Sequence, residues 1–265
     1  MTQSIQSIQS IRSGLVSVTF RQLAPEEVIP LAAQAGLDGI EWGGDVHVPH
    51  GDIEQARRVR RRTLDAGLAV ASYGSYYRVG DVEPCPFEAV LATALALGAP
   101  LIRVWAGKRA SAEADAGYRE RVVSDARRIG ELASQSGIHI AFEFHVGTLA
   151  DGLDTTLQLL RAVAHNNVKT YWQPPLGSLL ADNLAAIAAI SPWLANVHVF
   201  HWGPTPREQM ALAEGAAVWL PYLRRIAAAP GERFAMLEFV KDGAPQSFVA
   251  DAATLLSWLR RVYDD

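Results

Sequence analysis

A carboxylate and an imidazole stand two residues apart in the stretch IHIAFEFHVGTLAD, which covers residues 138–151. If this stretch begins as a β-strand, Glu143 and His145 share one face, and Phe142 and Phe144 share the other. Burying ionisable groups without partners is costly, since even an uncharged polar group costs on the order of 2–7 kcal/mol. A bound metal ion is the simplest compensation, so the sequence predicts a metal site here.

Three further side chains that can ligate a metal stand at the ends of later apolar segments of strand length. These are Gln173, His198 and Glu238. With Glu143 they offer two carboxylates, one amide oxygen and one imidazole nitrogen, a mixed set that suits one divalent ion such as Mn, Mg, Co or Zn. Two carboxylates balance the charge of the ion and leave positions open for two adjacent oxygens of a substrate.

Regular alternation of strand-like and helix-like segments predicts the scaffold. The expected strands cover residues 15–20, 37–42, 68–73, 100–105, 138–144, 168–172, 196–200 and 234–239. The expected helices cover residues 24–35, 53–66, 87–97, 118–136, 153–164, 183–190, 217–228 and 248–262. Strands separated by helices run parallel, and eight such units in about 250 residues is the size of a closed (β/α)8 TIM barrel. An open doubly wound sheet is the alternative, but the chain has no Gly-rich phosphate loop.

Chemistry in such barrels occurs at the C-terminal ends of the strands, so polar and aromatic residues there are candidate substrate contacts. These candidates are Glu41, Trp42, His47, Tyr73, Arg103, Trp105, His201, Arg207 and Lys241.

Each candidate also has a purely structural interpretation. Glu41 alone at a strand end suits an Arg or Lys partner, His198 suits a satisfied core histidine, and the tryptophans suit the core. Arg207 suits a substrate phosphate or oxygen, or equally a loop ion pair. The arginine-rich run at 57–62 suits a solvated or acid-paired outer helix face rather than nucleic acid, given the overall acidity.

Composition narrows the class of protein. The 265 residues are 49% hydrophobic and carry a net charge of −4, which gives no electrostatic footprint for nucleic acid or an anionic membrane. The single cysteine, Cys85, excludes an intramolecular disulfide and favours a reducing, cytoplasmic location. No apolar run is long enough for a transmembrane helix. We expect residues 1–13 to form a flexible tail and residues 14–265 to form one domain.

With these residues identified, the chain resembles the sugar phosphate isomerase/epimerase superfamily, the xylose isomerase-like barrels that also include endonuclease IV and inosose dehydratase. The resemblance covers residues 14–262. It is carried by the segments GIEWGGDVHVPHGD, IRVWAG, GIHIAFEFHVGTLAD, TYWQP, NVHVFHWG and LEFVKD.

The resemblance implies one catalytic divalent metal bound at the ends of strands five to eight. The usual ligand set is Glu, Asp, His and Glu, and the matching positions here are Glu143, Gln173, His198 and Glu238. Gln173 departs from the pattern, since a neutral amide ligates more weakly than a carboxylate. In ketose 3-epimerases of the family the two metal-bound glutamates also move the substrate proton, and the resemblance gives Glu143 and Glu238 that role.

The leading functional hypothesis is a metal-dependent isomerase or epimerase of a sugar or related polyol. A metal that chelates a carbonyl and its neighbouring hydroxyl acidifies the C–H between them by stabilising an enediolate. His145 would hold a substrate hydroxyl or act as the base itself. We expect a small-molecule substrate and a homodimer, as such barrels often pair.

Three alternatives stay open. The first is a lyase or dehydratase on a keto-sugar or keto-inositol, including cleavage of C-glycosides. The second is a non-catalytic metabolite-binding barrel that has lost its metal, which Gln173 keeps under consideration. The third, DNA repair of the endonuclease IV type, needs several metals and a basic face, and the charge of −4 argues against it.

Overall fold

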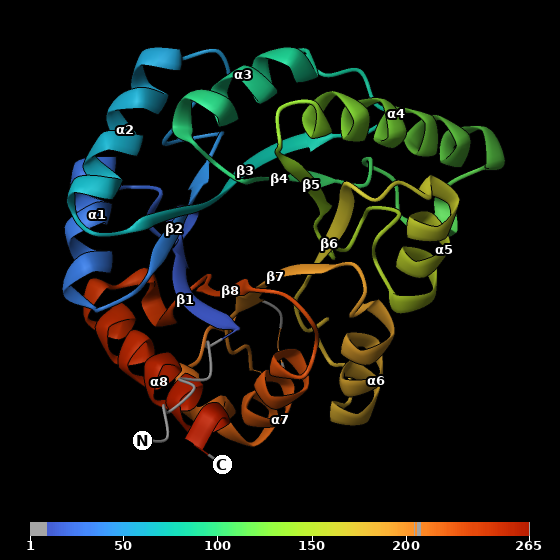
Figure 1. The fold of residues 1–265 in the computed structure, drawn as a ribbon. Helices are drawn as coiled ribbons and strands as arrows, with labels where there is room; N and C mark the ends of the chain where they lie inside the picture. Colours follow the sequence, from blue (N-terminus) through green and yellow to red (C-terminus); the bar gives the residue numbers. More distant parts are fainter. Residues whose placement is uncertain (1–9, 204, 206–207, 265) are drawn as a thin grey trace, which may run out of the picture.

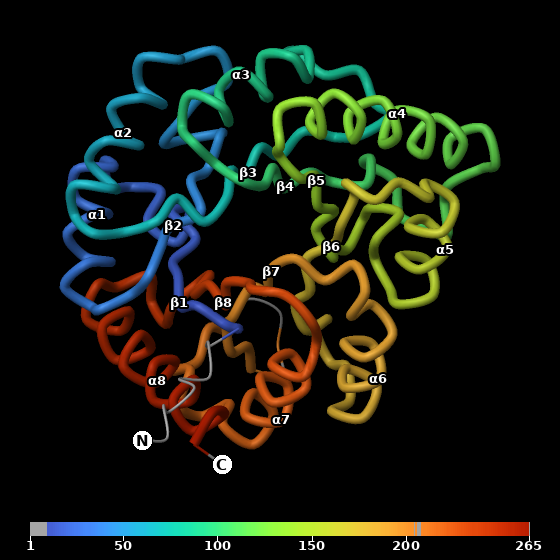
Figure 2. The backbone as a smooth tube through the Cα atoms, viewed as in Figure 1, coloured from blue at the N-terminus to red at the C-terminus, as the bar shows by residue number. Residues whose placement is uncertain are grey.

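The computed structural model describes residues 10–203, 205 and 208–264. Within them, eight parallel strands form a closed barrel in chain order (Figure 1). β1 pairs with both β2 and β8, which closes the barrel, and the dark-blue and red-orange ends of the tube meet there in Figure 2. The strands are β1 (Ile11–Val16), β2 (Gly39–Gly43), β3 (Ala69–Arg78), β4 (Leu101–Trp105), β5 (His139–Phe142), β6 (Val168–Trp172), β7 (Leu194–Val199) and β8 (Arg233–Leu237).

A helix follows each strand and covers the outside of the barrel (Figure 1). Local signals set several helix ends: Asp52 and Asp115 accept backbone N–H bonds at the start of α2 and α4, and Gly98 adopts φ 73° at the end of α3. The helices are α1 (Pro25–Gln34), α2 (Ile53–Asp65), α3 (Phe87–Leu97), α4 (Ala116–Ser134), α5 (Leu153–Val163), α6 (Leu180–Ile190), α7 (Ala216–Ala227) and α8 (Pro245–Asp264). The expected α/β class and single (β/α)8 TIM barrel are therefore confirmed.

Alternation along each strand separates two apolar layers. In β4, Ile102 and Val104 pack in the large cluster between strands and helices, whereas Leu101 lies in the small cluster inside the barrel. Tyr171 of β6 likewise lies in the inner cluster while its neighbour Trp172 packs outward. Because successive side chains point to opposite faces and Phe142, Trp172 and Leu237 point outward, this alternation directs the residue after β5, β6 and β8 toward the barrel mouth.

The first strand differs from the sequence-based prediction. β1 covers Ile11–Val16 rather than 15–20, and Ser17–Phe20 forms a 3-10 turn. The expected tail at 1–13 thus overlaps the sheet at its last three residues, while residues 1–9 lie outside the described part of the chain. The strand contains Arg, Ser and Gly, which are weak strand signals. Its polar Ser13 is accommodated because its N–H and hydroxyl both donate to Asp38.

The fifth strand is shorter than expected, ending at Phe142 rather than at 144. Glu143 still continues the ladder, since its N–H donates to the Val104 carbonyl at 2.9 Å. Beyond it the backbone turns, so Phe144 lines the pocket instead of pointing away from it. The strict two-residue period predicted for Glu143 and His145 is therefore wrong, although both side chains line the pocket.

Among the residues that the structure describes, no helix has the length and apolarity needed to cross a bilayer. A homodimer, a cytoplasmic location and the absence of a nucleic-acid partner stay predictions.

Candidate functional site

A pocket of about 930 Å³ opens at the C-terminal ends of the strands. Its floor carries polar side chains, among them Glu143, Gln173 and Glu238. Its walls are rich in aromatic rings. These rings are Tyr76, Trp105, Phe144, Phe200, Trp202, Trp219, Tyr222 and Phe239.

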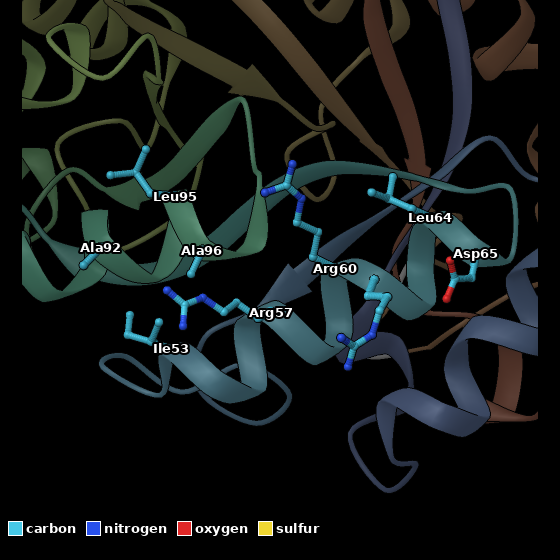
Figure 3. A pocket seen from close by; sticks show the side chains of 9 residues that line it. Ile53, Arg57, Arg60, Leu64, Asp65, Ala92, Leu95 and Ala96 are labelled. Atoms are coloured by element: carbon cyan, nitrogen blue, oxygen red, sulfur yellow. The ribbon is translucent and has the colours of Figure 1, made fainter.

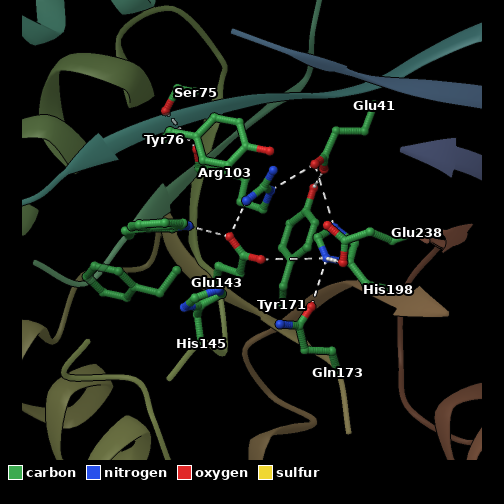
Figure 4. A network of polar contacts seen from close by, with 12 residues as sticks. Glu41, Ser75, Tyr76, Arg103, Glu143, His145, Tyr171, Gln173, His198 and Glu238 are labelled. Carbon is green, nitrogen blue, oxygen red and sulfur yellow. Dashed lines mark hydrogen bonds and ion pairs between the residues drawn. The ribbon is translucent and has the colours of Figure 1, made fainter. Parts of the chain in front are cut away.

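The predicted metal ligands converge at the floor of this pocket (Figure 4). One ligand atom each from Glu143, His198 and Glu238 lies within 4.8 Å of the other two. His198 Nδ1 is 3.1 Å from Glu238 Oε2 and 3.8 Å from Glu143 Oε1. The same nitrogen is 2.9 Å from Gln173 Oε1. Three oxygens from β5, β6 and β8 therefore surround one nitrogen from β7.

Strand register brings these four residues together. Glu143, Gln173 and Glu238 each directly follow the last residue of β5, β6 and β8. Glu238 N–H donates to the Val199 carbonyl at 3.0 Å, which fixes its backbone beside β7. His198 is the penultimate residue of β7 and is fully buried. The four side chains thus reach one point from adjacent strands.

The electrostatics of this cluster favour a bound cation. Burial lowers the pKa of His198, but the charge and hydrogen bond of Glu238, together with Glu41, outweigh it and raise that pKa to about 10. The buried carboxylates thus keep the imidazole protonated at pH values well above the ordinary histidine pKa of 6.5. A divalent ion at Nδ1 would take the place of that proton and satisfy the same oxygens, so the donor set fits a metal.

Glu143 divides its two oxygens between separate tasks. Oε2 accepts from an Arg103 guanidinium nitrogen and, at 2.5 Å, from Trp105 Nε1. Oε1 is left facing His198. Glu143 is 3% exposed, so these bonds hold the carboxylate in one orientation with a single oxygen available for a metal.

Arg103 and Glu41 lie directly beneath the cluster. Arg103 Nε donates to Glu41 Oε1 at 2.8 Å, and both side chains are fully buried. Burial alone would raise the pKa of Glu41, but Arg103 and His198 outweigh it and hold that pKa far below its usual range. Neither residue lines the pocket, so the prediction that Glu41 and Arg103 contact the substrate is corrected. The structure instead contains the alternative considered for Glu41, an ion pair with an arginine.

His145 lines the pocket next to Glu143 in a defined chemical form. Its Nδ1 lies 2.6 Å from the Val146 carbonyl oxygen. A carbonyl only accepts, so in the neutral ring Nδ1 carries the proton and Nε2 keeps a lone pair. The ring stacks on Trp105, with ring centroids 4.7 Å apart. His145 is therefore oriented as a base.

Three other predicted substrate contacts lie outside the pocket. Trp42 and Tyr73 are fully buried, and the Tyr73 hydroxyl donates to the Val48 carbonyl at 2.7 Å. His47 is also buried and lies 3.0 Å from the Ser17 hydroxyl. Contrary to the prediction, these side chains do not line the pocket, because Trp42 and Tyr73 point outward from β2 and β3 into the core between strands and helices.

The remaining candidates divide. Trp105 and His201 line the pocket, so their contact with a substrate stays a prediction, whereas Lys241 does not line it. Arg207 lies outside the described residues.

Sequence reasoning did not single out Tyr76 as a site residue. Its backbone adopts φ 57° where the pairing of β3 with β4 shifts register. This bulge places the Tyr76 ring in the pocket wall and against the Arg103 guanidinium, whose Cζ lies 4.8 Å from the ring centroid. The signal for it in the sequence is the pair Tyr76 and Tyr77, which lies just beyond the expected third strand.

The arginine-rich run at 57–62 lies on the outer surface, away from the strand ends (Figure 3). Arg57 pairs with Glu54 at 2.9 Å and Arg62 with Glu26 at 3.0 Å. A groove of about 740 Å³ between α2 and α3 is lined by Arg57, Arg60 and Arg61 together with apolar side chains. The expected solvated or acid-paired outer helix face is confirmed.

Comparisons with known proteins agree with this fold. A family model described as the xylose isomerase-like TIM barrel matches residues 29–262. A 3-dehydroshikimate dehydratase from Bacillus anthracis is 26% identical in an alignment of 205 residues that covers 71% of this chain and 71% of that protein.

Two solved structures illustrate the likeness. The probable 3-DHS dehydratase AsbF from Bacillus anthracis superposes with a TM-score of 0.77 at 21% identity, covering 93% of this chain and 99% of its own. D-psicose 3-epimerase from Clostridium cellulolyticum H10 gives a TM-score of 0.67 at 17% identity, covering 95% of this chain and 99% of its own. The family match extends over most of the chain and agrees with the observed barrel, and the protein belongs to the xylose isomerase-like TIM barrel family.

Proposed function

We propose that this protein is a divalent-metal-dependent lyase that removes water from a hydroxylated cyclic ketone. The observation that carries the proposal is that an oriented base, His145, lines one pocket together with Glu143 and Glu238, the two carboxylates that converge on the buried His198. Base and cluster together are what proton abstraction beside a carbonyl requires.

When a divalent ion is bound by Glu143, Gln173, His198 and Glu238, it supplies a Lewis acid that polarises the ketone and neutralises charge developing on its oxygen. His145 Nε2 takes the proton from the carbon beside the carbonyl. The resulting imidazolium then donates that proton to the hydroxyl on the next carbon, which leaves as water with the C–O bonding pair. The electron pair of the broken C–H bond becomes the new C=C bond, and the proton leaves in the water, so His145 ends the reaction in its starting form.

Two observations favour a lyase over the isomerase that led the sequence-based hypotheses. Glu143 commits one oxygen to Arg103 and Trp105, so only its other oxygen remains for a metal. His145 Nε2, beside Glu143 in the pocket, is a basic atom that the proposed metal does not use. The Bacillus anthracis relative named as a 3-dehydroshikimate dehydratase supports the same choice.

An epimerase is the second candidate. Glu143 and Glu238 both line the pocket, on either side of His198 Nδ1. Two carboxylates placed in this way suit removal of a proton from one face of a carbon and return to the other.

The products of the reaction decide between these functions. Purified protein with added Mn²⁺ is incubated with 3-dehydroshikimate and, separately, with a panel of ketoses and C-glycosides of 3-keto sugars. Loss of one water in mass spectrometry supports the dehydratase, a new isomer of equal mass supports the epimerase, and a released aglycone supports C-glycoside cleavage. Ligand binding without turnover, unchanged by a chelator, would instead support the metabolite-binding barrel.

A further inference from the structure

The two ring nitrogens of His198 face different surroundings. Nδ1 is surrounded by Gln173 Oε1, Glu238 Oε2 and Glu143 Oε1 at 2.9, 3.1 and 3.8 Å. Nε2 points away from this cluster into the barrel interior. It is buried and has no hydrogen-bond partner within the described residues. Nδ1 is therefore the atom placed to bind a metal.

Glu41 is the group that faces the other nitrogen. Its Oε1 lies 3.6 Å from His198 Nε2, and both side chains have no exposed surface. A buried N–H left without an acceptor costs about 1–3 kcal/mol, so an N–H at Nε2 is drawn to this carboxylate. A metal at Nδ1 requires that the ring proton reside on Nε2.

The structure holds Glu41 in place from three other directions. Oε2 accepts from the Ser72 hydroxyl at 2.7 Å and from the Tyr171 hydroxyl at 2.9 Å. Oε1 accepts from Arg103 Nε at 2.8 Å. A carboxylate with this many donors cannot rotate away from His198 without breaking buried bonds.

Arg103 connects the same carboxylate to a second ligand. While its Nε bonds Glu41, another of its guanidinium nitrogens bonds Glu143 Oε2 (Figure 4). One carboxylate on β2 thus reaches His198 on β7 directly and Glu143 after β5 through the arginine.

We propose that Glu41 is a positioning residue of the metal site that selects the Nδ1-ligating form of His198 and, through Arg103, fixes the orientation of Glu143. This inference rests on the proposed function, because it requires a metal at the ends of β5–β8. It removes Glu41 from the substrate contacts and gives it an effect on metal affinity instead.

Metal affinity of Glu41→Gln provides the test. Mn²⁺ and Zn²⁺ binding are measured by calorimetry on the full-length protein, beside Asp251→Asn as a matched control. Asp251 is another buried carboxylate, which accepts from Leu212 N–H and lies outside this network. We expect a 10- to 100-fold weaker Kd in Glu41→Gln, the range typical for loss of a hydrogen-bond partner behind a metal ligand. Asp251→Asn should bind as the wild type does.

A spectroscopic readout covers the case in which Glu41→Gln fails to fold. In wild type with ¹⁵N-labelled histidine and bound Zn²⁺, we expect His198 to show Nδ1 ligated and Nε2 protonated. Ligation through Nε2 would overturn the inference, as would an unchanged Kd in a folded Glu41→Gln. Wild-type protein that binds neither metal would instead contradict the proposed function, and the inference with it.

Discussion

The indole ring of Trp105 stacks on the imidazole of His145, with ring centroids 4.7 Å apart and planes inclined by 23°. The same indole donates its Nε1–H to Glu143 Oε2 at 2.5 Å. One side chain at the end of β4 therefore contacts both the proposed base and a proposed metal ligand. This ring therefore helps to fix the position of His145 relative to Glu143.

Replacing Trp105 with Phe tests that relationship. Phenylalanine can keep an aromatic contact with His145 but cannot donate to Glu143. A hydrogen bond to a charged group contributes about 1.5–3 kcal/mol, so we expect kcat or metal affinity to fall roughly 10- to 100-fold. Steady-state kinetics and calorimetry on the same preparation measure both. Unchanged values for both would show that the indole N–H has no role in orienting Glu143.

His145→Gln should abolish most turnover while leaving the metal site intact. Loss of a general acid–base group costs about 10²–10⁴ in rate, and among the described residues the His145 side chain forms no hydrogen bond or ion pair with any of the four predicted ligands. His139→Gln is the matched control, because His139 is an exposed histidine at the other end of the same strand. A His145 variant with wild-type kcat, or one that loses metal binding, would contradict the assigned role.

The clustering of the predicted metal ligands could be predicted from the sequence because consecutive strands of a (β/α)8 barrel are neighbours in space. Four successive strands carry Glu143, Gln173, His198 and Glu238 at or just beyond their C-terminal ends. Closure of the sheet brings these strand ends together around one barrel mouth. The exact strand ends were unnecessary, since a ligand just beyond β5 reaches the same point as one within it. Strand order in the barrel therefore located the candidate ligand cluster although the boundary of β5 was wrong.

The substrate wall was less predictable because loops rather than strands place it. Trp42 and Tyr73 lie within β2 and β3 on the face turned toward the helices, in register with each other and with the outward Ile102, so they pack in the outer core. Tyr76 enters the pocket only because a register shift gives it φ 57°. That register shift does not follow from hydrophobic alternation. Whether Glu41 faces substrate or lies beneath the ligands likewise depends on which side chains fill the barrel interior.

Arg103→Ala should strongly destabilise the metal-free protein. The guanidinium is 1% exposed and pairs with both Glu41 and Glu143, so its removal leaves two buried carboxylates uncompensated. Breaking a buried pair in this way costs about 3–5 kcal/mol. Urea unfolding with chelator present measures the loss. Arg57→Ala, at an exposed ion pair, should shift stability by no more than about 0.5 kcal/mol. Equal effects of the two substitutions would disprove the account of Arg103.

His47 should contribute to loss of stability at mildly acidic pH. Burial lowers its pKa below the ordinary 6.5, although hydrogen bonds to the Leu23 and Phe20 carbonyls partly offset this. The unfolded chain then binds the proton more readily. The contribution of His47 is therefore present above pH 6.5 and is lost as pH falls from there through the folded-state value.

We expect His47→Asn to be less stable at neutral pH and to lose less stability on acidification than the wild type. Unfolding free energies from about pH 8 to about pH 5 test this, since the slope reports the proton difference. The exposed His139 provides the control substitution, His139→Asn. A pH profile for His47→Asn parallel to that of the wild type would show that His47 is protonated equally in both states.

Metal binding tests the central claim most directly. Protein is stripped with chelator, incubated with Mn²⁺, dialysed and analysed for bound metal, with Glu238→Gln and the exposed-helix control Glu120→Gln in parallel. A mixed oxygen and nitrogen site of this type predicts about one equivalent in the wild type and in Glu120→Gln, and loss of metal in Glu238→Gln. Retention of the same metal by Glu238→Gln, or no metal in the wild type even with excess Mn²⁺, would contradict the claim.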